Sequence, residues 1–178
     1  MKIFFSLCII WMMGFGMLDA QFRVSSPAFE NMKAIPSKYA MKAVLGGKNI
    51  SIPLAWENAP KETKSFAVTI VDLHPIANNW VHWIVVDIPP SVTSLLEGAS
   101  MSKNKPPKSH ELMNSFGELG YGGPQPPKGS GAHKYEITVY ALSVDSIGLD
   151  VHSPLEKFRK VLEGKILGSA KMVGVFER

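Results

Sequence analysis

Asp72, His82, His133 and Tyr135 stand at the ends of apolar runs in this chain, and their side chains could together bind a small anion. Asp72 closes SFAVTIVD, His82 lies near the start of NWVHWIVVDIPP, and the other two open HKYEITVYAL. Imidazoles carry protons at mildly acid pH, a carboxylate orients a histidine, and a phenol donates a hydrogen bond. If these ends converge, phosphate, phosphonate, sulfate or carboxylate groups are natural guests.

Residue spacing predicts which neighbours these polar side chains have, because side chains two apart share one face of a strand. Each polar residue is thereby placed on an apolar face: Asp72 with Phe66, Val68 and Ile70; His82 with Ile84, Val86 and Ile88; His133 and Tyr135 with Ile137 and Val139. A simpler interpretation stays open for each. A histidine on such a face is often only a core residue, and Asp72 could cap the turn before His74 and Pro75.

The elements that must position these residues are mainly strands. Alternating or β-branched segments predict strands at 50–56, 65–72, 80–88, 135–142 and 172–176. The segment 121–131, YGGPQPPKGSG, predicts a shaped loop, because its prolines and glycines suit neither a helix nor a central strand.

One helix is predicted near the C-terminus. Ser153 is a candidate N-cap, Pro154 fits the first helical position and Glu156 completes a capping box, with Gly164 ending the helix. A shorter helix is expected at 92–96. The whole indicates a mainly β domain with peripheral helices.

The chain length of 178 residues, 46% of them hydrophobic, suits one domain at 21–178. Residues 1–20 have the basic start, apolar stretch and final alanine of a secretory signal, and the apolar stretch is short for a membrane span. We expect its cleavage to leave no stable span and an exported protein, periplasmic or secreted. An uncleaved anchor is the alternative. The only cysteine, Cys8, lies inside this segment.

Charge and motifs exclude several functions. The net charge of +4 is dispersed, without the basic and aromatic interleaving of a nucleic-acid groove. Asp72, His74, His82 and His133 are types that bind divalent metals, but no H-E-x-x-H, G-x-S-x-G or phosphate-loop motif occurs. We therefore predict no metal, no cofactor and no catalytic role, with an unrecognised hydrolase or metal enzyme as the weakest alternative.

Two segments, VDLHPIANNWVHWIVVDIP and YGGPQPPKGSGAHKYEITVYAL, resemble the paired signatures of the phosphatidylethanolamine-binding protein family. The resemblance spans about residues 22–178 and is closest to the bacterial and archaeal Raf-kinase-inhibitor-like (YbhB/YbcL) branch. It implies a large central β-sheet packed on a smaller sheet, peripheral helices, and an anion pocket at one end of the sheets.

The resemblance also implies ligand-binding residues. By motif they are Asp72, His82, His133 and Tyr135, with Gly123, Pro124, Gln125 and Pro126 in the loop that borders the pocket. His74 replaces the second acid of the family's D-x-D-A-P motif, and the following alanine is missing. The bond equivalent to His74–Pro75 is cis in relatives, but an X–Pro bond is usually trans, so the sequence leaves both isomers open here.

The resulting prediction is a non-catalytic protein that binds a phosphate or phosphorylated head group and possesses a short cavity rim. An alternative is a protein-interaction module in which the exterior of residues 121–128 docks a partner. Some family members resemble inhibitors of kinases or proteases, and an exported chain is better placed to meet a protease.

Overall fold

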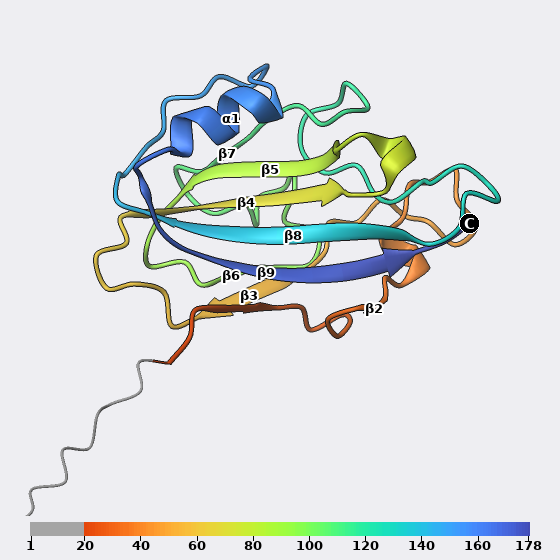
Figure 1. Cartoon of the computed structure of the whole chain (residues 1–178), viewed down its shortest axis with the longest axis horizontal. Coiled ribbons are helices and arrows are strands. Elements are labelled where there is room, and N and C mark those ends of the chain that lie inside the picture. The colour runs from red at the N-terminus through yellow and green to blue at the C-terminus, as the bar shows by residue number, and fades with distance from the viewer. Residues whose placement is uncertain (1–19) are drawn as a thin grey trace, which may run out of the picture.

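The computed structural model describes residues 20–178, which form two packed β-sheets and one α-helix (Figure 1). The larger sheet has the strand order β2-β9-β8-β4-β5-β7, and only the β2–β9 pair is parallel. Its strands are β2 (Lys33–Ala34), β4 (Ser65–Asp72), β5 (Trp80–Ile88), β7 (His110–Glu111), β8 (His133–Leu142) and β9 (Ile166–Phe176).

The smaller sheet is antiparallel, with the order β1-β3-β6. It contains β1 (Arg23–Ser25), β3 (Leu54–Glu57) and β6 (Ser94–Leu95). Two 3₁₀ turns, Ser37–Tyr39 and Pro75–Ala77, and the helix α1 (Leu155–Leu162) complete the elements. The mainly β fold with two sheets and a helix near the C-terminus is confirmed.

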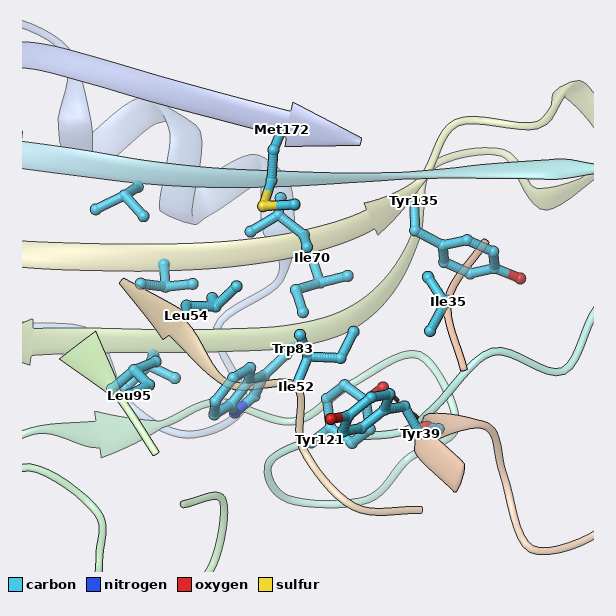
Figure 2. Packing of buried hydrophobic residues seen from close by; sticks show 14 of the residues in the cluster. Ile35, Tyr39, Ile52, Leu54, Ile70, Trp83, Leu95, Tyr121, Tyr135 and Met172 are labelled. Atoms are coloured by element: carbon cyan, nitrogen blue, oxygen red, sulfur yellow. Dashed lines mark hydrogen bonds between the residues drawn. The ribbon is translucent and has the colours of Figure 1, made fainter. Parts of the chain in front are cut away.

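The main hydrophobic core lies between the two sheets. Leu54 and Leu95 from the smaller sheet face Ile70, Trp83 and Met172 from the larger one (Figure 2). On the opposite face of the larger sheet, α1 packs a second cluster that includes Phe158, Leu162, Ala67, Ile84 and Leu142. Because both faces are covered, every residue of β4 is buried and only the strand ends are free to form a site.

The predicted strands 65–72 and 80–88 match β4 and β5. Strand β8 begins two residues before the predicted start, at His133, and β9 begins at Ile166, six residues before its predicted start. In the first predicted segment only residues 54–56 are paired, as the first part of β3, which continues to Glu57. The long strands that carry the polar residues were therefore the most predictable.

The predicted capping of the C-terminal helix is wrong. Pro154, not Ser153, is the N-cap of α1, and it makes no side-chain capping bond. Ser153 is buried, and its Oγ has no hydrogen-bond partner among the described residues. The helix expected at 92–96 is also wrong, because Ser94 and Leu95 pair with β3 as strand β6.

The predicted signal segment lies outside the described residues except for Ala20. Within residues 20–178, no helix has the length and apolar character that a bilayer span requires.

Candidate functional site

A cavity of about 450 Å³ opens at the end of the larger sheet where β4 finishes and where β5 and β8 begin. Its polar lining consists of Asp72, His82, Gln125, His133 and Tyr135. Four of these five were placed on apolar strand faces by spacing alone. The structure thus brings together side chains that lie up to 63 residues apart in the chain.

Asp72 and His133 form a buried pair at the bottom of this site. His133 Nδ1 lies 2.6 Å from Asp72 Oδ2, and both side chains are at most 5% exposed. The other carboxylate oxygen, Oδ1, accepts the backbone N–H of His74 at 2.9 Å. Because a carboxylate only accepts hydrogen bonds, Asp72 holds the Nδ1 proton of His133 in place.

His74 covers the face of the His133 ring rather than lining the cavity. The two imidazole rings stack with centroids 3.9 Å apart and planes 12° apart. No cis peptide bond occurs among residues 20–178, so the bond before Pro75, which the sequence left open, is trans. Asn78 and Asn79 then turn the chain into β5 with φ of 48° and 59°, in the left-handed region that asparagine tolerates. This compact turn is the short rim that the sequence predicted.

His82 reaches the cavity through a β-bulge. Ile70 pairs with Trp83 and Val71 with Val81, so His82 is an extra residue on β5. A bulge of this kind re-aims one side chain. His82 therefore faces the cavity beside Tyr135, with ring centroids 5.0 Å apart, while Ile84 and Val86 belong to the cluster on the other face. The prediction that His82 shares the face of Ile84 and Val86 is wrong.

Burial controls the charge of His82. Its side chain is 3% exposed, and Nδ1 donates to the Gly122 carbonyl oxygen over 2.6 Å. Loss of hydration lowers the pKa of His82 to about 4, although the Gly122 carbonyl and the Asp72 charge act in the opposite direction. His82 is thus neutral at pH 7, and its Nε2 is a hydrogen-bond acceptor.

Tyr135 supplies a donor that nothing in the described residues uses. The residue is 1% exposed, and its hydroxyl has no hydrogen-bond partner there. Burial, reinforced by the negative charge and the nearby carboxylate oxygens of Asp72, which form no hydrogen bond of regular geometry with the hydroxyl, raises the pKa of Tyr135, so the phenol keeps its proton. In Figure 2 the Tyr135 ring lies at one edge of the core and its hydroxyl points away from the other labelled residues. Buried donors normally have partners, which makes this hydroxyl a candidate ligand contact.

The rest of the cavity wall is apolar. It consists of Ile76, Ala77, Trp80, Phe116, Pro126 and Pro127. The Phe116 ring packs edge-on against both Trp80 and His82, with centroid distances of 5.3 and 5.6 Å. Apart from Pro126, the sequence did not single these residues out as site residues. Trp80 was detectable from its place two residues before His82, whereas Phe116 comes from an unrelated loop with no local signal.

Comparison with known proteins decides the family. The family model described as phosphatidylethanolamine-binding protein matches residues 25–177. The chain belongs to the phosphatidylethanolamine-binding protein family. The UPF0098 protein of Aquifex aeolicus is 37% identical over 161 residues, which cover 87% of this chain and 88% of that protein.

Two further relatives of the phosphatidylethanolamine-binding protein family are informative. Escherichia coli YbcL is 33% identical over 162 residues, 89% of this chain and 88% of its own. Its crystal structure superposes with a TM-score of 0.83 at 32% identity, covering 89% of this chain and 99% of YbcL. A Mycobacterium tuberculosis protein, named as a candidate lipoprotein, LppC, is 32% identical over 154 residues, 86% of this chain and 71% of its own.

The glycine/proline loop of this family member is anchored more than it is exposed to the cavity. Gln125 and Pro126 line the cavity, but Gly123 and Pro124 do not. Gly123 N–H donates to Asn49 Oδ1 over 2.7 Å, and a Cβ on Gly123 would lie 2.1 Å from the Tyr39 carbonyl oxygen. Only glycine fits this close approach, so Gly123 fixes the loop against residues 39–49.

Backbone donors in this loop are also occupied. The N–H of Gly122 donates to the His82 carbonyl oxygen over 2.8 Å, and that of Gly123 is used as described above. These two backbone N–H groups are therefore not available to a ligand.

Within residues 20–178, no three His, Cys, Asp or Glu side chains are grouped closely enough to hold a metal ion. Asp72, His82 and His133 share the cavity, but their nearest ring and carboxylate atoms are already engaged with one another or with the backbone. The arrangement is one of hydrogen-bond donors and acceptors around an open cavity.

Proposed function

We propose that this protein binds a small phosphate-bearing molecule in the cavity formed by Asp72, His82, His133 and Tyr135. The observation that carries the proposal is the Tyr135 hydroxyl, a buried donor without a partner in the described structure beside a cavity of about 450 Å³. A phosphate oxygen would satisfy it. Binding of this kind requires no chemical step on the ligand.

The charges of the site determine which phosphate species it accepts. At pH 7 His82 is neutral, and Asp72 adds negative charge next to His133. A phosphate dianion would therefore meet an acceptor at His82 Nε2 and a nearby carboxylate. A monoprotonated phosphate instead donates its P–OH to Nε2 and accepts from Tyr135. If that proton moves from the phosphate to His82 Nε2, the complex as a whole still holds the same number of protons.

Affinity should therefore depend on pH through one proton. A phosphomonoester loses its second proton with a pKa of about 6. Above that value the complex must take up a proton, so affinity for phosphoethanolamine should rise about tenfold per pH unit as pH falls from 8 to 6. Sulfate has no titratable proton in this range and should bind more weakly at every pH. Equal affinities at pH 6 and pH 8 would contradict this protonation scheme.

The apolar wall favours a ligand with an organic part attached to the phosphate. Ile76, Trp80 and Phe116 border the polar end of the cavity and offer contact surface to a carbon substituent. Inorganic phosphate should therefore bind less tightly than a phosphomonoester that fills this side.

Isothermal titration calorimetry with phosphate and phosphoethanolamine tests the binding proposal. His133→Ala should abolish the binding heat, because it removes the partner of Asp72 and leaves an unpaired buried carboxylate in the site. His152→Ala is the matched control, since His152 is exposed and lies outside the cavity. Each variant is first checked for folding by circular dichroism. No heat with either ligand from the folded wild-type protein would overturn the proposal.

A protein partner is the second candidate function, favoured by a specific surface. Exposed Lys128 borders an open groove of about 1110 Å³ that also includes Lys42, Leu45 and Arg178, and Leu45 is 96% exposed. An acidic surface with an apolar contact would complement this groove. Lys128→Gln should weaken such a partner, an inhibited protease for example, while leaving phosphate binding unchanged. The opposite pattern would favour the small-ligand role alone.

We also propose export, supported by the apolar segment at the N-terminus. The test is the mass of the protein recovered from the cell envelope or medium after expression of the full chain. A chain that starts at Gln21 agrees with cleavage after Ala20. A full-length chain in the cytoplasm contradicts it.

A further inference from the structure

Ser130 extends the Asp72–His133 pair by one hydroxyl group, which the proposed binding role does not use. Its Oγ lies 2.9 Å from His133 Nε2, and His133 Nδ1 lies 2.6 Å from Asp72 Oδ2. The Asp72 carboxylate and the Ser130 hydroxyl thus contact the two different nitrogens of the His133 imidazole ring. This connectivity defines serine nucleophiles with a histidine base and an orienting acid, whatever the fold and order in the chain.

The proton on Ser130 has two available acceptors. Oγ donates to the Pro127 carbonyl oxygen over 2.7 Å, and rotation about the Cβ–Oγ bond directs the same proton to His133 Nε2 without moving the heavy atoms. Asp72 keeps the other ring proton on Nδ1, which leaves Nε2 as the base in neutral His133. The resting hydrogen bond to Pro127 also holds the serine rotamer in place.

A second serine shows what the turn alone requires. Ser102 donates from Oγ to the Ala99 carbonyl oxygen over 3.0 Å, and its backbone N–H bonds the same oxygen at 3.3 Å. Ser130 makes the same two bonds to Pro127. No histidine is among the hydrogen-bond partners of Ser102 in residues 20–178. The contact of Ser130 with His133 is therefore not required by the turn. Ser102 serves as the control serine, because it has the same turn without the histidine.

The surroundings of Ser130 suit attack on a carbonyl group. Ser130 is partly exposed, and its two contacts, Pro127 and His133, both line the cavity. Gly131, with φ of 82°, and Ala132 follow it, and neither backbone N–H has an acceptor within the described part of the chain. N–H groups directly after a nucleophile are typical donors to the oxyanion of acyl transfer.

We infer that Ser130, His133 and Asp72 give this protein a serine-hydrolase activity toward small carboxylic esters whose acyl group fits the apolar side of the cavity. Ser130 Oγ attacks the ester carbonyl carbon as its proton moves to His133 Nε2. The tetrahedral oxyanion then collapses, the ester C–O bond breaks, and the departing alkoxide takes the proton from Nε2. This leaves an acyl group on Ser130 and releases an alcohol.

Water completes the cycle. It attacks the acyl carbonyl carbon and gives a proton to Nε2, the bond between that carbon and Oγ breaks, and the proton returns to Oγ. Ester and water become acid and alcohol, with Ser130 regenerated. Ser130 and His133 are the catalytic residues here, and Asp72 is a positioning residue. The inference goes beyond the proposed binding function and shares with it Asp72, His133 and the apolar side of the cavity.

Labelling by a fluorophosphonate tests the nucleophile directly, because Oγ attack on phosphorus expels fluoride and leaves a stable adduct. The purified full chain should form one adduct, located on Ser130 by peptide mass spectrometry. Ser130→Ala should form none, and Ser102→Ala should react like the wild type. His133→Ala, or Asp72→Asn if the first variant is unfolded, should react at least on the order of 10²-fold more slowly. Hydrolysis of p-nitrophenyl acetate should follow the same order.

Two results would overturn the inference. One is a folded wild-type protein without an adduct on Ser130 under conditions that label a control serine hydrolase. The other is labelling of Ser130 at an unchanged rate in the folded histidine or aspartate variant, since that reactivity would owe nothing to the base. Phosphate binding by Ser130→Ala should persist, so failure of the hydrolase inference is distinguishable from failure of the binding proposal.

Discussion

Asp72 and Glu111 are both buried carboxylates, but their surroundings differ in one respect. Glu111 accepts from Trp83 Nε1 at 2.6 Å, from Ser100 Oγ at 2.5 Å and from the Met101 N–H at 2.9 Å. Each of these donors belongs to the protein. Asp72 is satisfied by His74 and His133, yet the adjacent Tyr135 hydroxyl has no partner in the described residues. We call the Glu111 cluster saturated, because each of its donors and acceptors has a protein partner and it can only stabilise the fold. The Asp72 cluster is unsaturated, because one donor remains that a ligand could bind.

The two carboxylates also differ in the space beside them. Asp72 lines a cavity of about 450 Å³, and Glu111 lines none of the principal hollows of residues 20–178. Both clusters lie at edges of the same two-sheet core. Burial of a charged residue is therefore a poor indicator of function by itself, and the useful indicator is a buried donor or acceptor left over beside an open volume.

The largest effect is expected from emptying the saturated cluster. Glu111→Ala leaves the Trp83 and Met101 donors without their acceptor, and each buried unsatisfied group costs about 1 to 3 kcal/mol. We expect the free energy of unfolding to fall by about 4 kcal/mol, measured by urea denaturation. Phosphate affinity of the folded fraction should stay unchanged. A loss below about 1 kcal/mol, or weakened phosphate binding, would remove the distinction between the clusters.

Acid should destabilise the unsaturated cluster through His82. The pKa of His82 is about 4 in the folded protein because of burial, against about 6.5 in the unfolded chain. Between these values the unfolded state binds more protons, so the free energy of unfolding falls as pH drops from 6.5 to 4. The full contribution is about 3 kcal/mol, and it is completely present only above pH 6.5.

His82→Asn provides the control for this acid effect, because its amide can still donate to the Gly122 carbonyl oxygen but does not titrate. Its free energy of unfolding should be flatter than that of the wild type over pH 4 to 6.5, in urea titrations at each pH. Parallel curves would show that His82 is not the group responsible.

Much of this site could be predicted from sequence where strand alternation is regular. In β4 and β8 the spacing of two correctly placed Asp72, His133 and Tyr135 with the core residues beside them. The long, apolar β5 was equally visible. Alternation fails at His82, because a bulge inserts one residue without changing the residue types around it, and only the partner strand shows where the register shifts.

Other features depend on contacts that no local window contains. The strands β2, β6 and β7 have two residues each, too few to show a period. Phe116 reaches the cavity from a separate loop, and Ser130 contacts His133 from the end of a turn that begins at Pro127. The capping-box pattern placed the N-cap at Ser153, one residue before the observed N-cap Pro154, because the sequence pattern allows either residue to cap the helix.

The smallest effects are expected from removing the hydroxyl group of one buried tyrosine in each cluster, and these two changes give the clearest contrast between the clusters. Tyr121, beside Trp83 and the Glu111 cluster, donates from its hydroxyl to the Tyr39 carbonyl oxygen over 2.9 Å, whereas Tyr135 has no partner in the described residues. Tyr121→Phe should lower the free energy of unfolding by about 1 kcal/mol and leave phosphate affinity unchanged. Tyr135→Phe should leave stability unchanged or slightly raised, because it removes an unpaired buried hydroxyl, and should weaken phosphate about tenfold. Urea denaturation and calorimetry on both variants measure the four quantities. If Tyr135→Phe costs stability and not affinity, its hydroxyl serves the fold, and the contrast between the saturated and the open cluster disappears.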